Sequence, residues 1–142
     1  MDQVPFEELC RQIVQGSNDA IIYSDREGII RLWNPGAEQM LGFSAAETIG
    51  QSLDIFIPEN QRPRHWDGYF KVMQTGTSRY EKDLLAAPAL RKDGTRISTE
   101  FSMTIIRDAA GEIAGTAAIM RDVTVRWEKE KALRKRLAEL DK

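Results

Sequence analysis

The sequence predicts an α+β domain in which a long helix packs against a small antiparallel sheet of five strands. Residues 96–107 alternate apolar and polar side chains, which is the period of a strand with one buried face. Short Gly-containing segments separate strand-like stretches, as they do in antiparallel hairpins. Residues 58–76 carry apolar side chains at three- and four-residue spacing, which favours one amphipathic helix between the two groups of strands.

Length and charge limit the classes of function. The chain has 142 residues, enough for one domain with a buried core. Its formal net charge of −2 gives no electrostatic argument for binding nucleic acid or a membrane. Its apolar runs are too short to span a bilayer or to act as a signal peptide, so we expect a cytoplasmic protein. The single cysteine, Cys10, is interpreted as a small packing residue.

The first part of the chain predicts a helix followed by a hairpin. Residues 4–15 have the spacing of a short amphipathic helix, with Pro5 in its first turn. Residues 20–24 and 29–33 predict two strands joined by a turn at residues 25–28. We expect the leading helix to cap the domain or to pair with a second copy of itself.

Capping signals predict two short helices after this hairpin. Asn34 suits a helix cap and Pro35 suits the first helical position, while Gly42 suits the helix end. Ser44, followed three residues later by Glu47, has the pattern of a capping box and predicts the start of the second short helix.

The long helix at residues 58–76 carries the only histidine of the chain, His65. Its predicted apolar stripe consists of Trp66, Tyr69, Phe70 and Met73. Because His65 lies beside this stripe, the helix is the element best placed to hold a buried cofactor.

Three strands are predicted in the C-terminal half, at residues 80–90, 96–107 and 112–121. The turns between them, at residues 91–94 and 108–111, contain Asp and Gly residues that tolerate left-handed backbone. The last strand is rich in small side chains, which leave room against the sheet for a bound group or a closely packed helix: Gly115, Ala117 and Ala118.

Residues 123–142 predict a helix that leaves the domain. Leu133, Leu137 and Leu140 have the spacing of a coiled-coil seam, although the preceding seam positions are charged. The seam is therefore short and weak by itself. We expect a homodimer formed through this helix and the leading helix, with the many charged side chains solvated.

Three segments resemble a known family: NDAIIYSDREGIIRLWNPGAEQMLGFSAAETIGQSL, RKDGTRISTEFSM and GTAAIMRDVT. With the order of elements, they are similar to PAS sensor domains. The resemblance implies a five-stranded antiparallel sheet with helices on one face, and a sensory role in signal transduction that acts on a downstream protein. It divides the chain into an N-terminal cap helix (1–16), a PAS domain (17–124) and a C-terminal signalling helix (125–142).

The long helix is similar to the haem-binding PAS domains of the FixL and DosP types. There the long helix supplies the proximal histidine, and His65 falls on that position without gaps. The resemblance implies haem b with His65 as the iron ligand, and sensing of a diatomic gas or of redox state. Lys71 falls where such sensors place a basic partner of a haem propionate. Leu85 stands where FixL-type sensors place an arginine that hydrogen-bonds the gas.

The expected cofactor site therefore combines residues of the helix with residues of the sheet. Its far wall is apolar, which favours uncharged gases or, as an alternative, lets Met120 approach the iron. The residues expected around the haem are His65, Tyr69, Lys71, Val72, Leu85, Ile105, Ala118 and Met120.

Other ligands remain open for a PAS fold. The site can instead hold a non-covalent flavin such as FAD or a small molecule, or the chain can be a cofactor-free dimerisation module. In the last case His65 faces solvent and side chains such as Trp66 and Met103 fill the interior. Cys10 lies outside an Asn-Cys-Arg motif, so no photochemical flavin adduct is expected. No paired-carboxylate or Ser–His pattern predicts catalysis, and we expect a protein that is not an enzyme.

Overall fold

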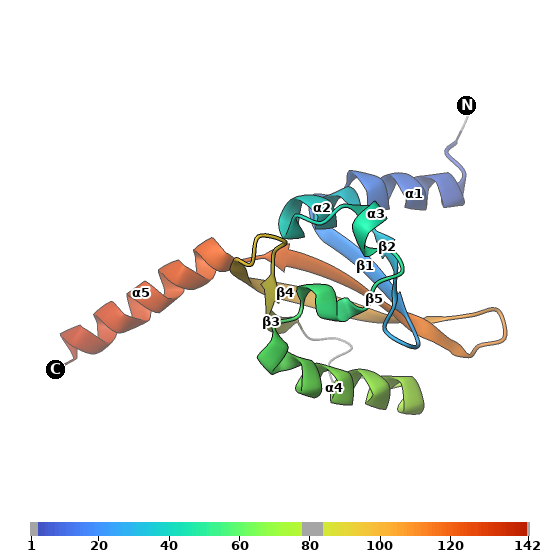
Figure 1. The fold of residues 1–142 in the computed structure, drawn as a ribbon. Coiled ribbons are helices and arrows are strands. Elements are labelled where there is room, and N and C mark those ends of the chain that lie inside the picture. The colour runs from blue at the N-terminus through green and yellow to red at the C-terminus, as the bar shows by residue number, and fades with distance from the viewer. Residues whose placement is uncertain (1–2, 78–83, 142) are drawn as a thin grey trace.

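The computed structural model describes residues 3–77 and 84–141. The strands form one antiparallel sheet in the order β2-β1-β5-β4-β3 (Figure 1), which confirms the predicted five-stranded sheet. The helices between β2 and β3 cover one face of this sheet, and the core lies between them and that face. The helices are α1 (Phe6–Gly16), α2 (Pro35–Leu41), α3 (Ala45–Thr48), α4 (Arg62–Thr75) and α5 (Thr124–Leu140). The strands are β1 (Ala20–Asp25), β2 (Ile30–Trp33), β3 (Leu85–Leu90), β4 (Arg96–Arg107) and β5 (Ile113–Asp122).

Alternation along the strands sets which side chains face the core. In β1, Ala20, Ile22 and Ser24 are buried, while the residues between them are partly exposed. Their antiparallel partners on β5 are Met120, Ala118 and Thr116. Because directly paired residues project from the same face, these two central strands present a continuous inner surface to the helices.

Only part of the predicted strand at residues 80–90 can be compared with the structure. β3 begins at Leu85; Leu84 lies outside the strand, and residues 80–83 lie outside the described part of the chain. Pro88 sits within β3, opposite Ser98. This position is tolerated because β3 is an edge strand, whose outer row of backbone groups needs no sheet partner.

Both predicted helix caps are confirmed. The Asn34 side chain accepts a hydrogen bond from the Ala37 amide, and α2 ends at Gly42 in left-handed conformation with φ 82°. Ser44 and Glu47 form a reciprocal capping box at the start of α3.

Asn34 also joins four segments of the chain. Its side chain is fully buried, and its Oδ1 accepts from the amides of Ile21 (2.8 Å) and Ala37 (3.0 Å). Its Nδ2 donates to the carbonyls of Val14 (2.8 Å) and Asp19 (3.1 Å). One amide therefore ties the end of α1, the α1–β1 linker, β1 and α2 together with every polar atom satisfied.

Two expectations for the long helix are corrected. A 3₁₀ turn at Glu59–Gln61 comes first, and α4 proper begins at Arg62. Phe70, assigned to the apolar stripe, is 46% exposed and stacks on Trp66 with ring centroids 5.5 Å apart. Spacing alone made the stripe too wide, because only Tyr69 and Met73 of that set are buried in the core.

The small residue Gly115 lets β5 approach β1 closely and does not make room for a bound group. A Cβ at this position would lie 1.9 Å from the Ser24 carbonyl oxygen of β1. Glycine is therefore required by the close approach of the two strands. Of the small residues in β5, Ala118 is the one that lines a cavity.

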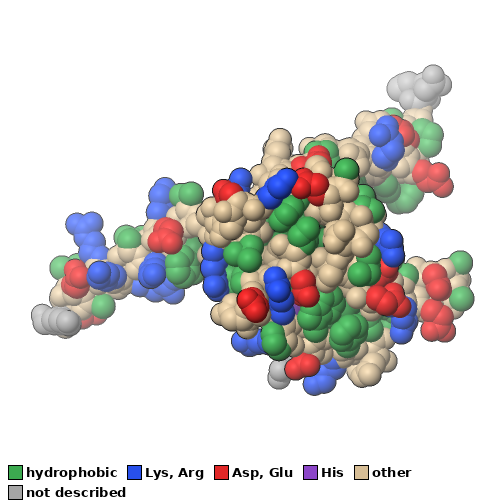
Figure 2. Space-filling view, in the orientation of Figure 1, with side chains coloured by type: hydrophobic (Ala, Val, Ile, Leu, Met, Phe, Trp, Pro, Cys, Tyr) green, Lys and Arg blue, Asp and Glu red, His purple; other side chains and the backbone are tan. Residues whose placement is uncertain are grey.

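The terminal helices bury little of their own surface. Neither α1 nor α5 contains a buried residue, and Phe6 of α1 is 78% exposed. In Figure 1, α5 projects away from the sheet, and Figure 2 shows basic side chains along it. Over the rest of that face, acidic and basic side chains are mixed. Within the described residues, no helix has the length and apolar character that crossing a membrane requires.

Candidate functional site

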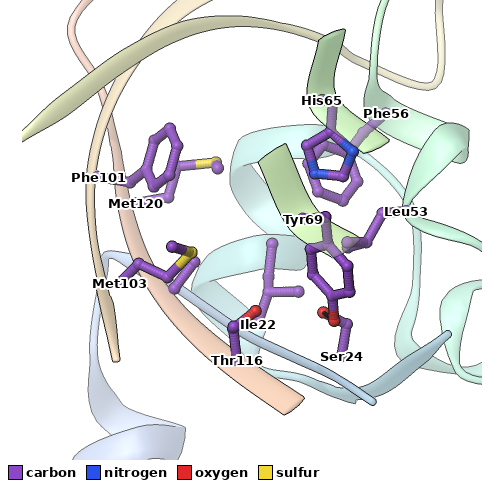
Figure 3. Close-up of a pocket in the computed structure, with 11 residues that line it drawn as sticks. Ile22, Ser24, Leu53, Phe56, His65, Tyr69, Phe101, Met103, Thr116 and Met120 are labelled. Carbon is purple, nitrogen blue, oxygen red and sulfur yellow. Dashed lines mark hydrogen bonds between the residues drawn. The ribbon is translucent and has the colours of Figure 1, made fainter. Parts of the chain in front are cut away.

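A cavity of about 80 Å³ lies between α4 and the inner face of the sheet. Figure 3 shows two opposed walls around it. The helix side is formed by Leu53, Phe56, His65 and Tyr69. The sheet side is formed by Ile22, Phe101, Met103, Ala118 and Met120, with the hydroxyls of Ser24 and Thr116 at one end. The cavity is thus mostly apolar, with one imidazole and one group of hydroxyls.

His65 points into this cavity from the second turn of α4. Its ring makes an edge contact with Trp66 (centroids 4.7 Å apart) and lies 5.7 Å from the ring of Tyr69. Its Nδ1 is buried and has no hydrogen-bond partner among the described residues. Burial lowers the pKa of His65, and the nearby Asp54 carboxylate opposes that shift only in part. The side chain is therefore a neutral imidazole, the form that binds a metal.

Trp66, the neighbour of His65, faces a different part of the fold. Its indole Nε1 donates to the Asp54 carboxylate at 2.8 Å. Its ring covers Gly28, where a Cβ would lie 2.1 Å from a ring atom. Trp66 is thereby held over the β1–β2 turn, and His65 is left to face the interior. The arrangement in which His65 faces bulk solvent is therefore wrong.

The buried imidazole predicts a pH dependence of stability. Because the folded-state pKa of His65 is lowered, the unfolded chain takes up this proton more readily, and protonation favours unfolding. The free energy of unfolding should therefore be highest above the normal histidine pKa and fall from about pH 7.5 to about pH 5.5. Urea unfolding of the wild type and of His65→Gln across this range measures it. Since the chain has one histidine, the variant should lose most of the slope; equal slopes would contradict the assignment.

The hydroxyl end of the cavity is organised by Tyr69. Its hydroxyl lies 2.9 Å from Ser24 Oγ and donates to the backbone carbonyl of Asp25. Thr116 lines the same end of the cavity. Burial raises the pKa of Tyr69, so the phenol stays protonated and able to donate at neutral pH.

The residues predicted for the site divide into two groups. His65, Tyr69, Ala118 and Met120 line the cavity together. The other four lie outside its lining. Val72 and Ile105 pack against the core, Leu85 is half-buried opposite Phe101 at the start of β3, and Lys71 is exposed on α4.

Several lining residues were not predicted from the sequence. Ser24 and Thr116 are polar residues at inward positions of otherwise apolar strands, and that break in the alternation was the signal that could have found them. Leu53 and Phe56 reach the cavity from a 3₁₀ turn at Leu53–Phe56, which the sequence showed only as an apolar cluster.

The chemistry of this site suits haem, but the cavity is smaller than haem requires. A partly buried, neutral imidazole whose Nδ1 is buried without a partner, in an apolar surround, is a suitable ligand for haem iron. A cavity of about 80 Å³, however, has room for roughly two or three water molecules, whereas cofactor sites run to about 300–1,000 Å³. Haem uptake therefore requires α4 to move away from the sheet.

An antiparallel sheet that faces a helix across an apolar cavity defines an α+β domain with an interior cavity. Over residues 8–123 the chain matches the family described as PAS fold, and it belongs to that family. The predicted resemblance is confirmed.

Relatives of the chain include named sensors. It is 31% identical over 131 residues to the sensor protein FixL of Bradyrhizobium diazoefficiens, covering 92% of this chain and 25% of that protein. It is 26% identical over 127 residues to the oxygen sensor protein DosP of Escherichia coli, covering 89% and 16%. The PAS domain of a Colwellia psychrerythraea protein matches with TM-score 0.74 at 22% identity, over 84% of this chain and 98% of that one.

These matches show the function of the chain at the level of its domain family. The chain spans a quarter or less of the length of these two sensor proteins. It is a PAS sensory domain of the kind found in signal-transduction proteins.

Proposed function

We propose that this chain is a cytoplasmic haem-based sensory domain that binds haem b through His65 and responds to a diatomic gas or to redox state. The observation that carries the proposal is the buried imidazole nitrogen without a partner, facing an apolar cavity. The similarity to FixL and to the oxygen sensor DosP supports the same function.

The residues of the chain have separate tasks in this proposal. When bound, haem supplies an iron atom that takes a gas ligand or changes oxidation state. His65 holds the iron from α4 with a lone pair that burial keeps unprotonated. Phe101, Met103 and Met120 exclude water from the opposite side. Lys71 is exposed on the same helix, and its ammonium would supply a positive charge for a haem propionate.

Titration of the purified protein with haemin tests this function. The expected result is a Soret band that saturates at one haem per chain and shifts when the iron is reduced under carbon monoxide. A protein that leaves haemin in its free, aggregated spectrum throughout the titration would reject the haem function.

A second candidate is a sensor that binds a small organic ligand directly, without iron. The cavity volume of about 80 Å³ favours it, because a ligand of a few heavy atoms needs a smaller opening than haem or a flavin such as FAD. Native mass spectrometry of protein purified from its source distinguishes the two. A bound small mass without haem supports this candidate.

We also propose that the domain acts as a homodimer through its terminal helices and passes its signal to a downstream protein. α1 exposes Phe6, Leu9 and Ile13, and α5 exposes its three seam leucines. Apolar side chains left exposed on a helix favour association.

Phe6→Asp is expected to shift the domain towards monomer, because it puts a charge into the proposed α1 contact. Light scattering over a concentration series measures this. Gln15→Asp adds a charge at an exposed polar position of the same helix and should leave the mass unchanged. A monomeric wild type, or equal masses for both variants, would contradict the dimer.

A further inference from the structure

The hydroxyl end of the cavity connects three elements at one point. Ser24 of β1 and Thr116 of β5 are direct cross-strand partners, and both are buried. Tyr69 reaches this pair from α4, and its hydroxyl also donates to the Asp25 carbonyl of β1. A single phenol thus bonds the helix to β1, one of the two central strands, beside its partner β5.

Tyr69 is the polar attachment of α4 to the sheet. Within the described residues, side-chain hydrogen bonds from α4 to a strand come from Tyr69 alone. The other polar side chains of this helix act locally: Arg62 bonds the carbonyls of Ile57 and Asp54, and Trp66 bonds the Asp54 carboxylate. His65 faces the cavity, and its buried Nδ1 has no hydrogen-bond partner in the described part of the chain.

His65 and Tyr69 lie one helical turn apart, so a movement of one displaces the other. The cavity is too small for haem, and a group bound at His65 would push α4 away from the sheet. The hydrogen bonds of Tyr69 join α4 to β1, and these are the elements that would move apart. This step rests on the proposed haem function.

We propose that the Tyr69 hydroxyl is a latch. It holds α4 on β1 while the cavity is closed and releases this strand when haem occupies the cavity. Ser24 and the Asp25 carbonyl lose their bonds to the phenol in the released form. The latch therefore regulates the same site, since its hydrogen bonds must be broken for binding.

The two strands under the latch also support both terminal helices. β1 follows Asp19 and β5 ends beside Arg121, and these two side chains form an ion pair at 3.1 Å. The six paired positions from Ala20 to Asp25 connect this ion pair to the latch along one continuous strand pair. Asp122, the next residue, accepts a hydrogen bond from the Thr124 amide at the start of α5. Release of Tyr69 thus acts on the strands that lead directly to α1 and α5.

Tyr69→Phe tests the latch because it removes the hydroxyl and keeps the ring. Tyr23→Phe is the matched control, since Tyr23 lies next to Ser24 on the outer face of β1. In protein without added haemin, amide hydrogen exchange in α4 should rise about fivefold in Tyr69→Phe, as expected for the loss of one net hydrogen bond, and stay at the wild-type rate in Tyr23→Phe. Unchanged exchange in Tyr69→Phe would overturn the latch.

Haemin titration gives the second readout, which a purely structural role would not produce. If binding must open the latch, Tyr69→Phe should bind haemin about fivefold more tightly than the wild type, because the hydrogen bond no longer has to be broken. Equal or weaker haemin affinity would overturn the coupling to the site. A wild type that binds no haemin would instead reject the proposed function. The exchange rates in α4 would then be the only test of whether the Tyr69 hydroxyl holds this helix on the sheet.

Discussion

His65→Ala is expected to abolish the haem absorbance of the reconstituted protein. The variant removes the one side chain of the cavity wall that offers a nitrogen lone pair to iron. Within the described residues, no group of three His, Cys, Asp or Glu side chains could hold a metal ion in its place. Loss of the ligand itself should exceed the roughly 10- to 100-fold weakening that follows loss of an outer partner. Haemin titration followed at the Soret maximum measures the change.

Gln74→Ala is the matched control, because Gln74 is exposed on the same helix. It should keep the wild-type haemin affinity, and circular dichroism should show that both variants remain folded. If His65→Ala gives a Soret band equal in position and intensity to that of the wild type, another residue holds the iron.

Asn34→Ala is expected to destabilise the domain by about 3–5 kcal/mol. The substitution leaves the buried amides of Ile21 and Ala37 without their acceptor and removes the N-cap of α2. It also frees the carbonyls of Val14 and Asp19. Because a domain of this size is stable by only about 5–15 kcal/mol, the loss should be large in urea unfolding.

Asn60→Ala supplies the comparison for this measurement. Asn60 is exposed in the 3₁₀ turn before α4, and its replacement should change the free energy of unfolding by less than about 0.5 kcal/mol. A similar, small effect in both variants would show that Asn34 does not hold the four segments together.

Local patterns predicted the elements of the fold. The strict alternation of residues 96–107 defined β4, and the caps at Asn34 and Ser44 defined the starts of α2 and α3. These signals act over a few residues, where spacing and backbone chemistry decide the structure. Leu84 was wrongly placed in β3, because no alternation or turn marks where the described residues begin to pair with β4.

Whether the His65 side chain faces the core or the solvent could not be predicted from such patterns. His65 and Trp66 are neighbours on one helix, and either could have faced the core. The choice is made by contacts distant in sequence: Trp66 packs over Gly28 and bonds Asp54, which turns the imidazole inward. The latch was missed for the same reason, since Ser24 and Asp25 meet Tyr69 only after the helix has packed on the sheet.

Imidazole rescue of His65→Gly tests most directly whether the cavity imidazole is the iron ligand. The variant should bind haemin without a wild-type Soret band, or not at all, because the ligand is missing. Addition of imidazole should restore the band at the wild-type position, since the free ring can occupy the space left by the side chain. A wild-type spectrum in His65→Gly without imidazole would contradict the central claim.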